Sequence, residues 1–215
     1  MKNQTTEQTV GQIIECTIAL WPAIPRLVET VVESIVDTYL LFTASATAER
    51  LEITARPIEQ ETRDRLTFEC LCMCVFLACS ISDLFFVARA RVTGEDGKGM
   101  ASVFRAALVH ALQEHCRQVG LSTRNEIVLV AVDPEPRFGH GSTTLDPMNR
   151  LEEYRKAAIS FQGSEVQRFG KWIGKALDTS HYPILELIGG CVVEDLLKST
   201  NEIVTAAFDV HFPVE

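Results

Sequence analysis

Asp83 and His115 are the two ionisable side chains that the sequence places on otherwise apolar helical stripes. Helical spacing aligns Asp83 with cysteine and phenylalanine positions, and it aligns His115 with phenylalanine, leucine and valine positions. A polar group directed at an apolar core must find a hydrogen-bond partner there. We therefore expect Asp83 and His115 to lie within hydrogen-bonding reach of each other or of one shared ligand.

Two interpretations of this pair stay open. In the first, each side chain makes a structural hydrogen bond; in the second, both anchor a ligand in an apolar pocket. The two expected helices are joined by a short glycine-rich segment and should pack antiparallel as neighbours. The residue counts on either side of that segment leave Asp83 and His115 roughly 12 Å apart along the axis. A shared pocket is thus favoured over a direct contact.

Four cysteines lie within ten residues, at Cys70, Cys72, Cys74 and Cys79. Thiolate ligands suit zinc or copper(I), but a structural zinc site takes cysteine pairs two to four residues apart together with a second matching pair. The apolar neighbours of these cysteines indicate small core thiols instead. We expect them to be buried and reduced, and we expect no metal and no cofactor.

Three further candidates stand in glycine-rich segments. Lys98 lies in Gly94-Glu-Asp-Gly-Lys-Gly99, whose glycine spacing differs from that of a phosphate-binding loop. A plain helix connection is the expected structure, with weak anion binding as the alternative. Arg137 and His140 stand in a second such loop, where a rigid scaffold could present them for function.

Common catalytic patterns are absent from the sequence. It contains no Glu-x-x-His pair, which carboxylate-bridged di-metal bundles use, and no Gly-x-Ser-x-Gly nucleophile elbow. These absences favour a protein that is not an enzyme.

Composition narrows the classes of partner. The chain of 215 residues has a formal charge of −9 and no basic block, which suits neither nucleic acid nor an anionic membrane surface. The longest uncharged stretch, 70–82, spans 13 residues, whereas a membrane-spanning helix needs about 20. Seven cysteines and a polar N-terminus predict reduced thiols in the cytoplasm.

Apolar periodicity predicts a helical protein. A helix that stops near Trp21 is followed by Pro22 and Pro25, and the next helix has valines and isoleucines on one face and acids on the other. A third helix is expected over about 58–92 and is apolar nearly all round. The remaining expected helices cover about 101–119, 147–161, 165–177 and 184–208.

The expected fold is therefore an all-α, single-domain bundle of six to eight helices. Its loop at 133–147 separates a larger N-terminal part from a smaller C-terminal part. A minor β element is the alternative for two segments: the β-branched run 127–132 could pair with 208–212, where polar and apolar residues alternate.

Two hypotheses for function follow. The first is a non-enzymatic adaptor or regulatory protein that acts through protein–protein contacts, with self-association as a homodimer expected. The second is a small-molecule-binding or enzymatic helical domain with its pocket near Asp83 and His115. A large apolar surface patch would favour the first, and a closed pocket would favour the second.

Overall fold

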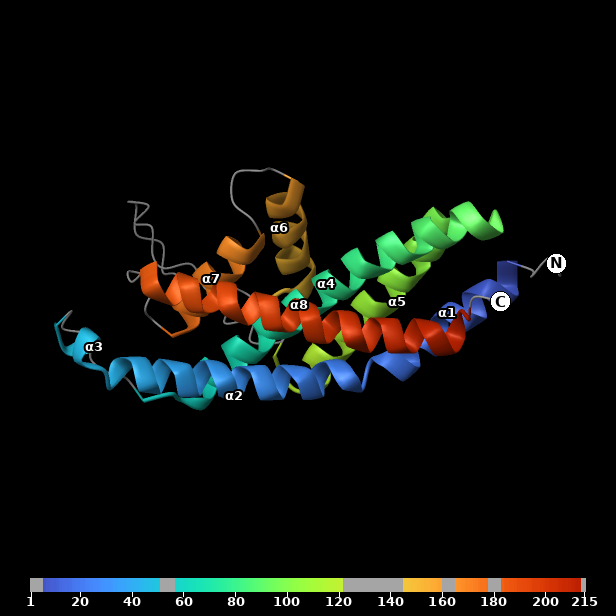
Figure 1. Cartoon of the computed structure of the whole chain (residues 1–215). Helices are drawn as coiled ribbons and strands as arrows, with labels where there is room; N and C mark the ends of the chain where they lie inside the picture. Colours follow the sequence, from blue (N-terminus) through green and yellow to red (C-terminus); the bar gives the residue numbers. More distant parts are fainter. Residues whose placement is uncertain (1–5, 51–56, 122–144, 160–164, 178–182, 214–215) are drawn as a thin grey trace, which may run out of the picture.

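The computed structural model describes residues 6–50, 57–121, 145–159, 165–177 and 183–213. Within these ranges every regular element is an α-helix, which confirms the predicted all-α class (Figure 1). The eight helices are α1 (Thr6–Leu20), α2 (Ala23–Thr43), α3 (Ala46–Arg50), α4 (Gln60–Thr93), α5 (Gly97–Gln118), α6 (Pro147–Ile159), α7 (Glu165–Ala176) and α8 (Pro183–His211).

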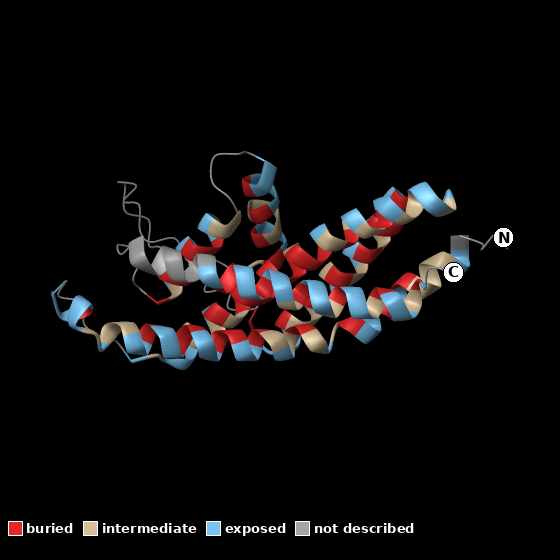
Figure 2. Cartoon of the chain, viewed as in Figure 1, coloured by how far each residue is buried: buried red, intermediate tan, exposed pale blue. Residues whose placement is uncertain are grey.

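Helix α4 forms the centre of the bundle. It packs against α2, α5, α6, α7 and α8, and its stretch 68–75 is buried without interruption (Figure 2). Among the described helices, α4 alone is long and apolar enough to cross a membrane, but 61% of its most apolar window is buried inside the protein. That burial is compatible with the core helix of a soluble protein, because a helix that is apolar all round needs helices on every side.

Proline separates α1 from α2 as expected. Helix α1 ends at Leu20 and α2 begins at Ala23, with Pro25 in its first turn, where the missing N–H leaves no hydrogen bond unmade. The apolar face of α2 is buried and its acidic face, including Glu29 and Glu33, is exposed. The amphipathic pattern therefore predicts correctly which face of α2 packs against the bundle.

The connection between α4 and α5 is shorter than predicted. Gly94 ends α4 with a φ of 74° and donates its N–H to the carbonyl of Ala90, a left-handed conformation that suits glycine. The Asp96 carboxylate then accepts a hydrogen bond from the backbone N–H of Gly99 at 3.0 Å and so caps α5. Helix α5 begins at Gly97 and not near residue 101, because the Asp96 cap starts it there. Gly97 itself lies directly against the carbonyl of Phe86 on α4.

The strand that was the alternative for 208–212 does not form. Residues 208–211 belong to α8, and Phe212 follows directly, with both phenylalanines buried. Phe208 and Phe212 are four residues apart, a spacing that also places them on one helical face. There they join an aromatic cluster with Phe86, whose ring centroid lies 5.3 Å from that of Phe208. The other predicted strand, 127–132, lies outside the described residues.

The C-terminal helices cover one end of α4. Asp146 accepts a hydrogen bond from the backbone N–H of Met148 at 2.9 Å and caps α6, which starts at Pro147 as expected. Helix α6 packs on α4 and on α7, and α7 packs along α8. Helix α8 continues through Gly189 and Gly190 without a break.

Candidate functional site

Asp83 lies beside an arginine of the neighbouring helix. Its Oδ2 is 2.5 Å from Nη2 of Arg105 on α5, and both side chains are nearly half exposed. The other oxygen, Oδ1, is buried and has no hydrogen-bond partner among the residues described. Asp83 thus satisfies one of its two oxygens by an ion pair at the edge of the α4–α5 contact.

His115 contacts a different helix. Its ring lies against Trp21, which follows α1, with ring centroids 5.7 Å apart and an edge-to-face angle of 67°. Partial burial lowers the pKa of His115 below its usual value. Ten residues separate it from Arg105, which is about 15 Å along α5. The structure therefore does not bring Asp83 and His115 together, and each has its own neighbour.

Of the three candidates in glycine-rich segments, the structure describes only one. Lys98 is exposed in the first turn of α5, which leaves its ammonium group in solvent. Arg137 and His140 lie outside the described residues.

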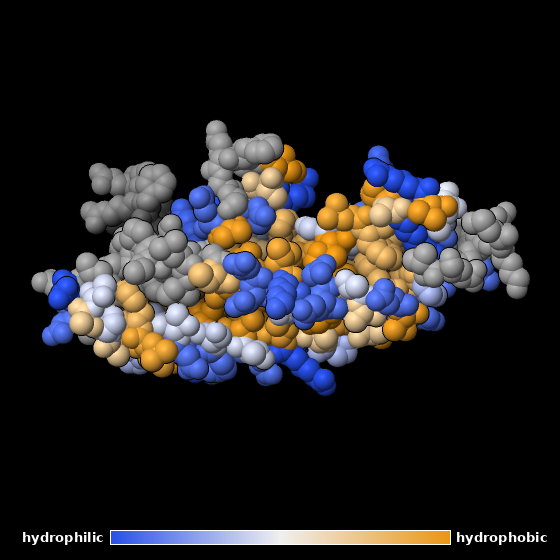
Figure 3. All heavy atoms as spheres, viewed as in Figure 1, coloured by the Kyte–Doolittle hydropathy of each residue, from blue (hydrophilic) through white to orange (hydrophobic). Residues whose placement is uncertain are grey.

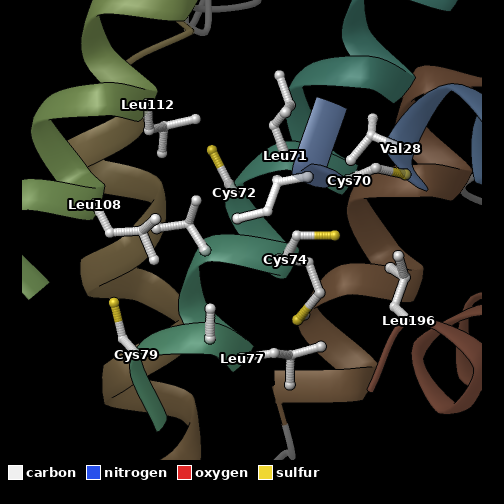
Figure 4. Close-up of a cluster of buried hydrophobic side chains, with 14 of the residues drawn as sticks. Val28, Cys70, Leu71, Cys72, Cys74, Leu77, Cys79, Leu108, Leu112 and Leu196 are labelled. Carbon is white, nitrogen blue, oxygen red and sulfur yellow. The ribbon is translucent and has the colours of Figure 1, made fainter. Parts of the chain in front are cut away.

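The clustered cysteines of α4 are buried thiols. Cys70, Cys72, Cys74 and Cys79 are free and buried, and burial raises the pKa of Cys74 and of Cys79 to about 12. Figure 4 shows Cys72 and Cys79 directed toward Leu108 and Leu112 of α5, whereas Cys70 and Cys74 point to the opposite side of α4. In the part of the chain that the structure describes, no three His, Cys, Asp or Glu side chains are placed to hold one metal ion.

A buried polar cluster joins α4 to α6, and the sequence interpretation missed it. Glu69 is 4% exposed, and its Oε2 lies 2.9 Å from Nε of Arg150. The same oxygen accepts a hydrogen bond from the hydroxyl of Tyr154 at 3.0 Å. Burial raises the pKa of Glu69 to about 7, and the charge of Arg150 and the hydrogen bond from Tyr154 only partly offset that rise.

Arg150 extends this cluster to α7. Its Nη1 donates to Oε2 of Glu153 at 2.8 Å, and its guanidinium carbon lies 3.4 Å from the centre of the Trp172 ring. The indole N–H of Trp172 donates to the same Glu153 oxygen at 3.1 Å. Lys175 approaches that ring as well, with Nζ 4.0 Å from its centre. Arg150 of α6 therefore links to α4 through an ion pair and to α7 through a cation–π contact.

A groove opens above Arg150. It encloses about 340 Å³ and is bounded by the first turns of α6 and by Trp172 of α7. Its charged side chains carry both signs, with Glu152 and Glu153 facing Arg150 and Lys156. A volume of this size could take a small polar molecule.

The sequence held a signal for this cluster. Glu69 is the one acid among the buried residues that run from Leu66 to Cys74, and Arg150 precedes Tyr154 by one helical turn on the inward face of α6. Each is a charge on a face that apolar spacing assigns to the core.

An exposed apolar surface lies at the far end of α4. Leu84, Val87, Ala88 and Val92 are all exposed there, and Leu84 and Val92 reach 75% and 77%. We call these four residues the α4 stripe. Figure 3 shows apolar surface between charged side chains at this end of the molecule, where α4 and α5 extend beyond α6 (Figure 1).

Comparison with known proteins gives no relative. No family model matches the chain, and neither a curated protein nor a solved structure matches it.

Proposed function

We propose that the protein is a non-enzymatic helical interaction module that binds a second copy of itself through the α4 stripe. The supporting observation is the exposure of Leu84 and Val92, at 75% and 77%, on one helix. Burying apolar surface in a contact contributes about 25 cal/mol per Å² to the free energy of association. Exposed apolar surface that gathers on one element is typical of a contact site.

The charges beside the stripe support a twofold contact. Asp83 and Arg91 lie four residues on either side of Val87. A twofold axis at Val87, with the two α4 helices antiparallel, places Arg91 of each chain opposite Asp83 of the other. Asp83 is 42% exposed, so its carboxylate would pair with the partner's Arg91 in addition to Arg105 of its own chain. Homodimers are built from such self-complementary surfaces, and the opposite charges would fix the register of the two helices.

Sedimentation equilibrium tests this proposal. We expect the unaltered chain to dimerise and Leu84→Ser/Val92→Ser to be monomeric at the same concentration. Leu41→Ser/Val210→Ser is the matched control, because Leu41 and Val210 are both 75% exposed but lie on α2 and α8. The control should remain dimeric. A monomeric unaltered chain at every concentration, or equal loss in both variants, would contradict the proposal.

A small-molecule-binding domain is the second candidate, and one observation favours it. The groove above Arg150 places a buried guanidinium and an indole beside polar groups in about 340 Å³. Native mass spectrometry of the purified protein tests it. A bound small molecule that is lost in Trp172→Ala would support this candidate, and a mass equal to the bare chain would oppose it.

We also propose a cytoplasmic location. All seven cysteines are free, and a reducing compartment keeps thiols in that state. Fractionation of cells that express the full chain with a small C-terminal tag tests this, and recovery of the chain in the membrane fraction would contradict it.

A further inference from the structure

We propose that Glu69 is the proton-binding group of a latch, which holds α6 and α7 against α4 when its carboxyl is protonated and loosens them when it is ionised. This latch goes beyond the proposed self-association, because it acts at the opposite end of α4. Its parts are Glu69, Arg150, Tyr154, Glu153 and Trp172.

Glu69 of α4 contacts α6 directly and is connected to α7 through Arg150. Its Oε2 alone contacts both Arg150 and Tyr154 of α6, at 2.9 and 3.0 Å. Arg150 in turn lies on Trp172 of α7. A change in the charge of this single carboxyl therefore acts on the α4–α6 and α6–α7 contacts together.

Charge balance explains why a proton matters here. One guanidinium serves two carboxylates, because Arg150 contacts Glu153 at 2.8 Å as well as Glu69. With Glu69 protonated, Arg150 and Glu153 neutralise each other, and Tyr154 keeps a neutral hydrogen bond to Glu69. With Glu69 ionised, a second negative charge is buried beside a cation that is already paired, which is costly.

The direction of the pH dependence follows from this balance. The pKa of Glu69 is raised from 4.5 to about 7 while α6 is docked, and it returns toward 4.5 when undocking exposes the carboxyl to water. A group with a raised pKa in the docked state stabilises that state fully at low pH. This stabilisation is lost as the pH rises through about 7.

The other groups facing Glu69 do not reverse this direction. On α4, burial raises the pKa of Cys70 and of Cys72 well above its usual value, so both thiols stay neutral. On α6, Glu153 opposes ionisation of Glu69, whereas Arg150 and the Tyr154 hydroxyl favour it. On α7, Lys175 is a further nearby cation, and burial lowers its own pKa. Desolvation of Glu69 remains the largest effect.

The groove would respond to the latch. Arg150 lines it from α6 and Trp172 from α7, and both are held through Glu69. Loosening of α6 from α4 therefore changes the shape of the groove with pH.

Tryptophan fluorescence tests the latch. The chain has two tryptophans, so Trp21→Phe leaves Trp172 as the single reporter and removes the indole that contacts His115. We expect its fluorescence to change with a midpoint near pH 7. In Trp21→Phe/Glu69→Gln, which keeps the shape but not the charge, the signal should stay at its low-pH value. An unaltered transition in that variant would overturn the proposal.

Two further variants in the Trp21→Phe chain should shift the midpoint in opposite directions. Tyr154→Phe removes a hydrogen bond that favours the ionised carboxylate, so the midpoint should move to higher pH. Glu153→Gln removes a repelling charge and keeps an acceptor for Trp172, so the midpoint should move to lower pH. Shifts in the same direction would contradict the assignment to Glu69.

Hydrogen exchange tests the latch without any substitution. After correction for the intrinsic pH dependence of exchange, amides of α6 should lose protection above about pH 7, and amides of α2 should not. Equal protection of α6 on both sides of that pH would overturn the proposal.

Discussion

Arg150 of α6 lies over the indole of Trp172 on α7, with its guanidinium carbon 3.4 Å from the ring centre. The same side chain is 6% exposed and pairs with Glu69 of α4. Burial of this kind makes the cluster sensitive to the loss of Arg150, because Glu69 and Glu153 would then have no shared cation and the buried Glu69 no water to solvate its charge. Arg150 is therefore the side chain on which the docking of α6 and α7 depends most.

Removing Arg150 should destabilise the protein far more than removing Arg105. Above about pH 7, where Glu69 is ionised, Arg150→Ala leaves its charge buried without a cation, which costs about 3–5 kcal/mol. Arg105→Ala breaks an ion pair whose side chains are 49% and 42% exposed, and such pairs contribute about 0–1 kcal/mol. Urea unfolding of both variants measures the difference. Similar losses in the two would contradict the assigned roles.

Gly97 should not tolerate a side chain. A Cβ at this position would collide with the carbonyl of Phe86 and the side chain of Ala90, so Gly97→Ala should lower the free energy of unfolding by about 1–3 kcal/mol. Gly11 in α1 is the matched control, since a Cβ there meets nothing within 4 Å. Gly11→Ala should raise stability by about 0.5–1 kcal/mol. Thermal unfolding of both variants measures these changes in stability. A stabilised Gly97→Ala would show that α4 and α5 pack differently.

Thiol reactivity should single out one cysteine. Cys191 is exposed and the other six cysteines are buried, and burial raises the pKa of Cys16 and of Cys116 to about 12. A maleimide should therefore label one thiol quickly in the native protein and all seven after denaturation. Mass spectrometry of the labelled peptides identifies the site. Rapid native labelling of Cys70, Cys72 and Cys74 would contradict the buried position of α4.

Most of the helices could be predicted because local sequence determines them. Pro22 and Pro25 end one helix and start the next, and the valines and isoleucines of α2 occupy one face with no competing pattern. The strand alternative at 208–212 has a physical reason, since phenylalanines four residues apart fit both a strand and a helix. Only the tertiary contact of Phe208 with Phe86 decides between them.

The polar cluster was harder to predict than the helices that carry it. Glu69 and Arg150 are 81 residues apart in the sequence, and no spacing rule connects positions on α4 and α6. Asp83 and His115 do not contact each other for a related reason. Helix α1 lies beside α5, so His115 packs against Trp21. Periodicity indicates which face of a helix is buried, but not which helix covers it.

Disulfide cross-linking tests the central claim, that two chains meet at the α4 stripe. Ala88→Cys places a thiol within the stripe, and Cys191→Ser removes the one exposed native thiol. Under mild oxidation we expect this variant to form a covalent dimer rapidly. A matched variant with Ser34→Cys on the exposed face of α2, also carrying Cys191→Ser, should form it slowly. Equal rates in the two variants, or no covalent dimer of the Ala88→Cys variant, would contradict the α4 contact.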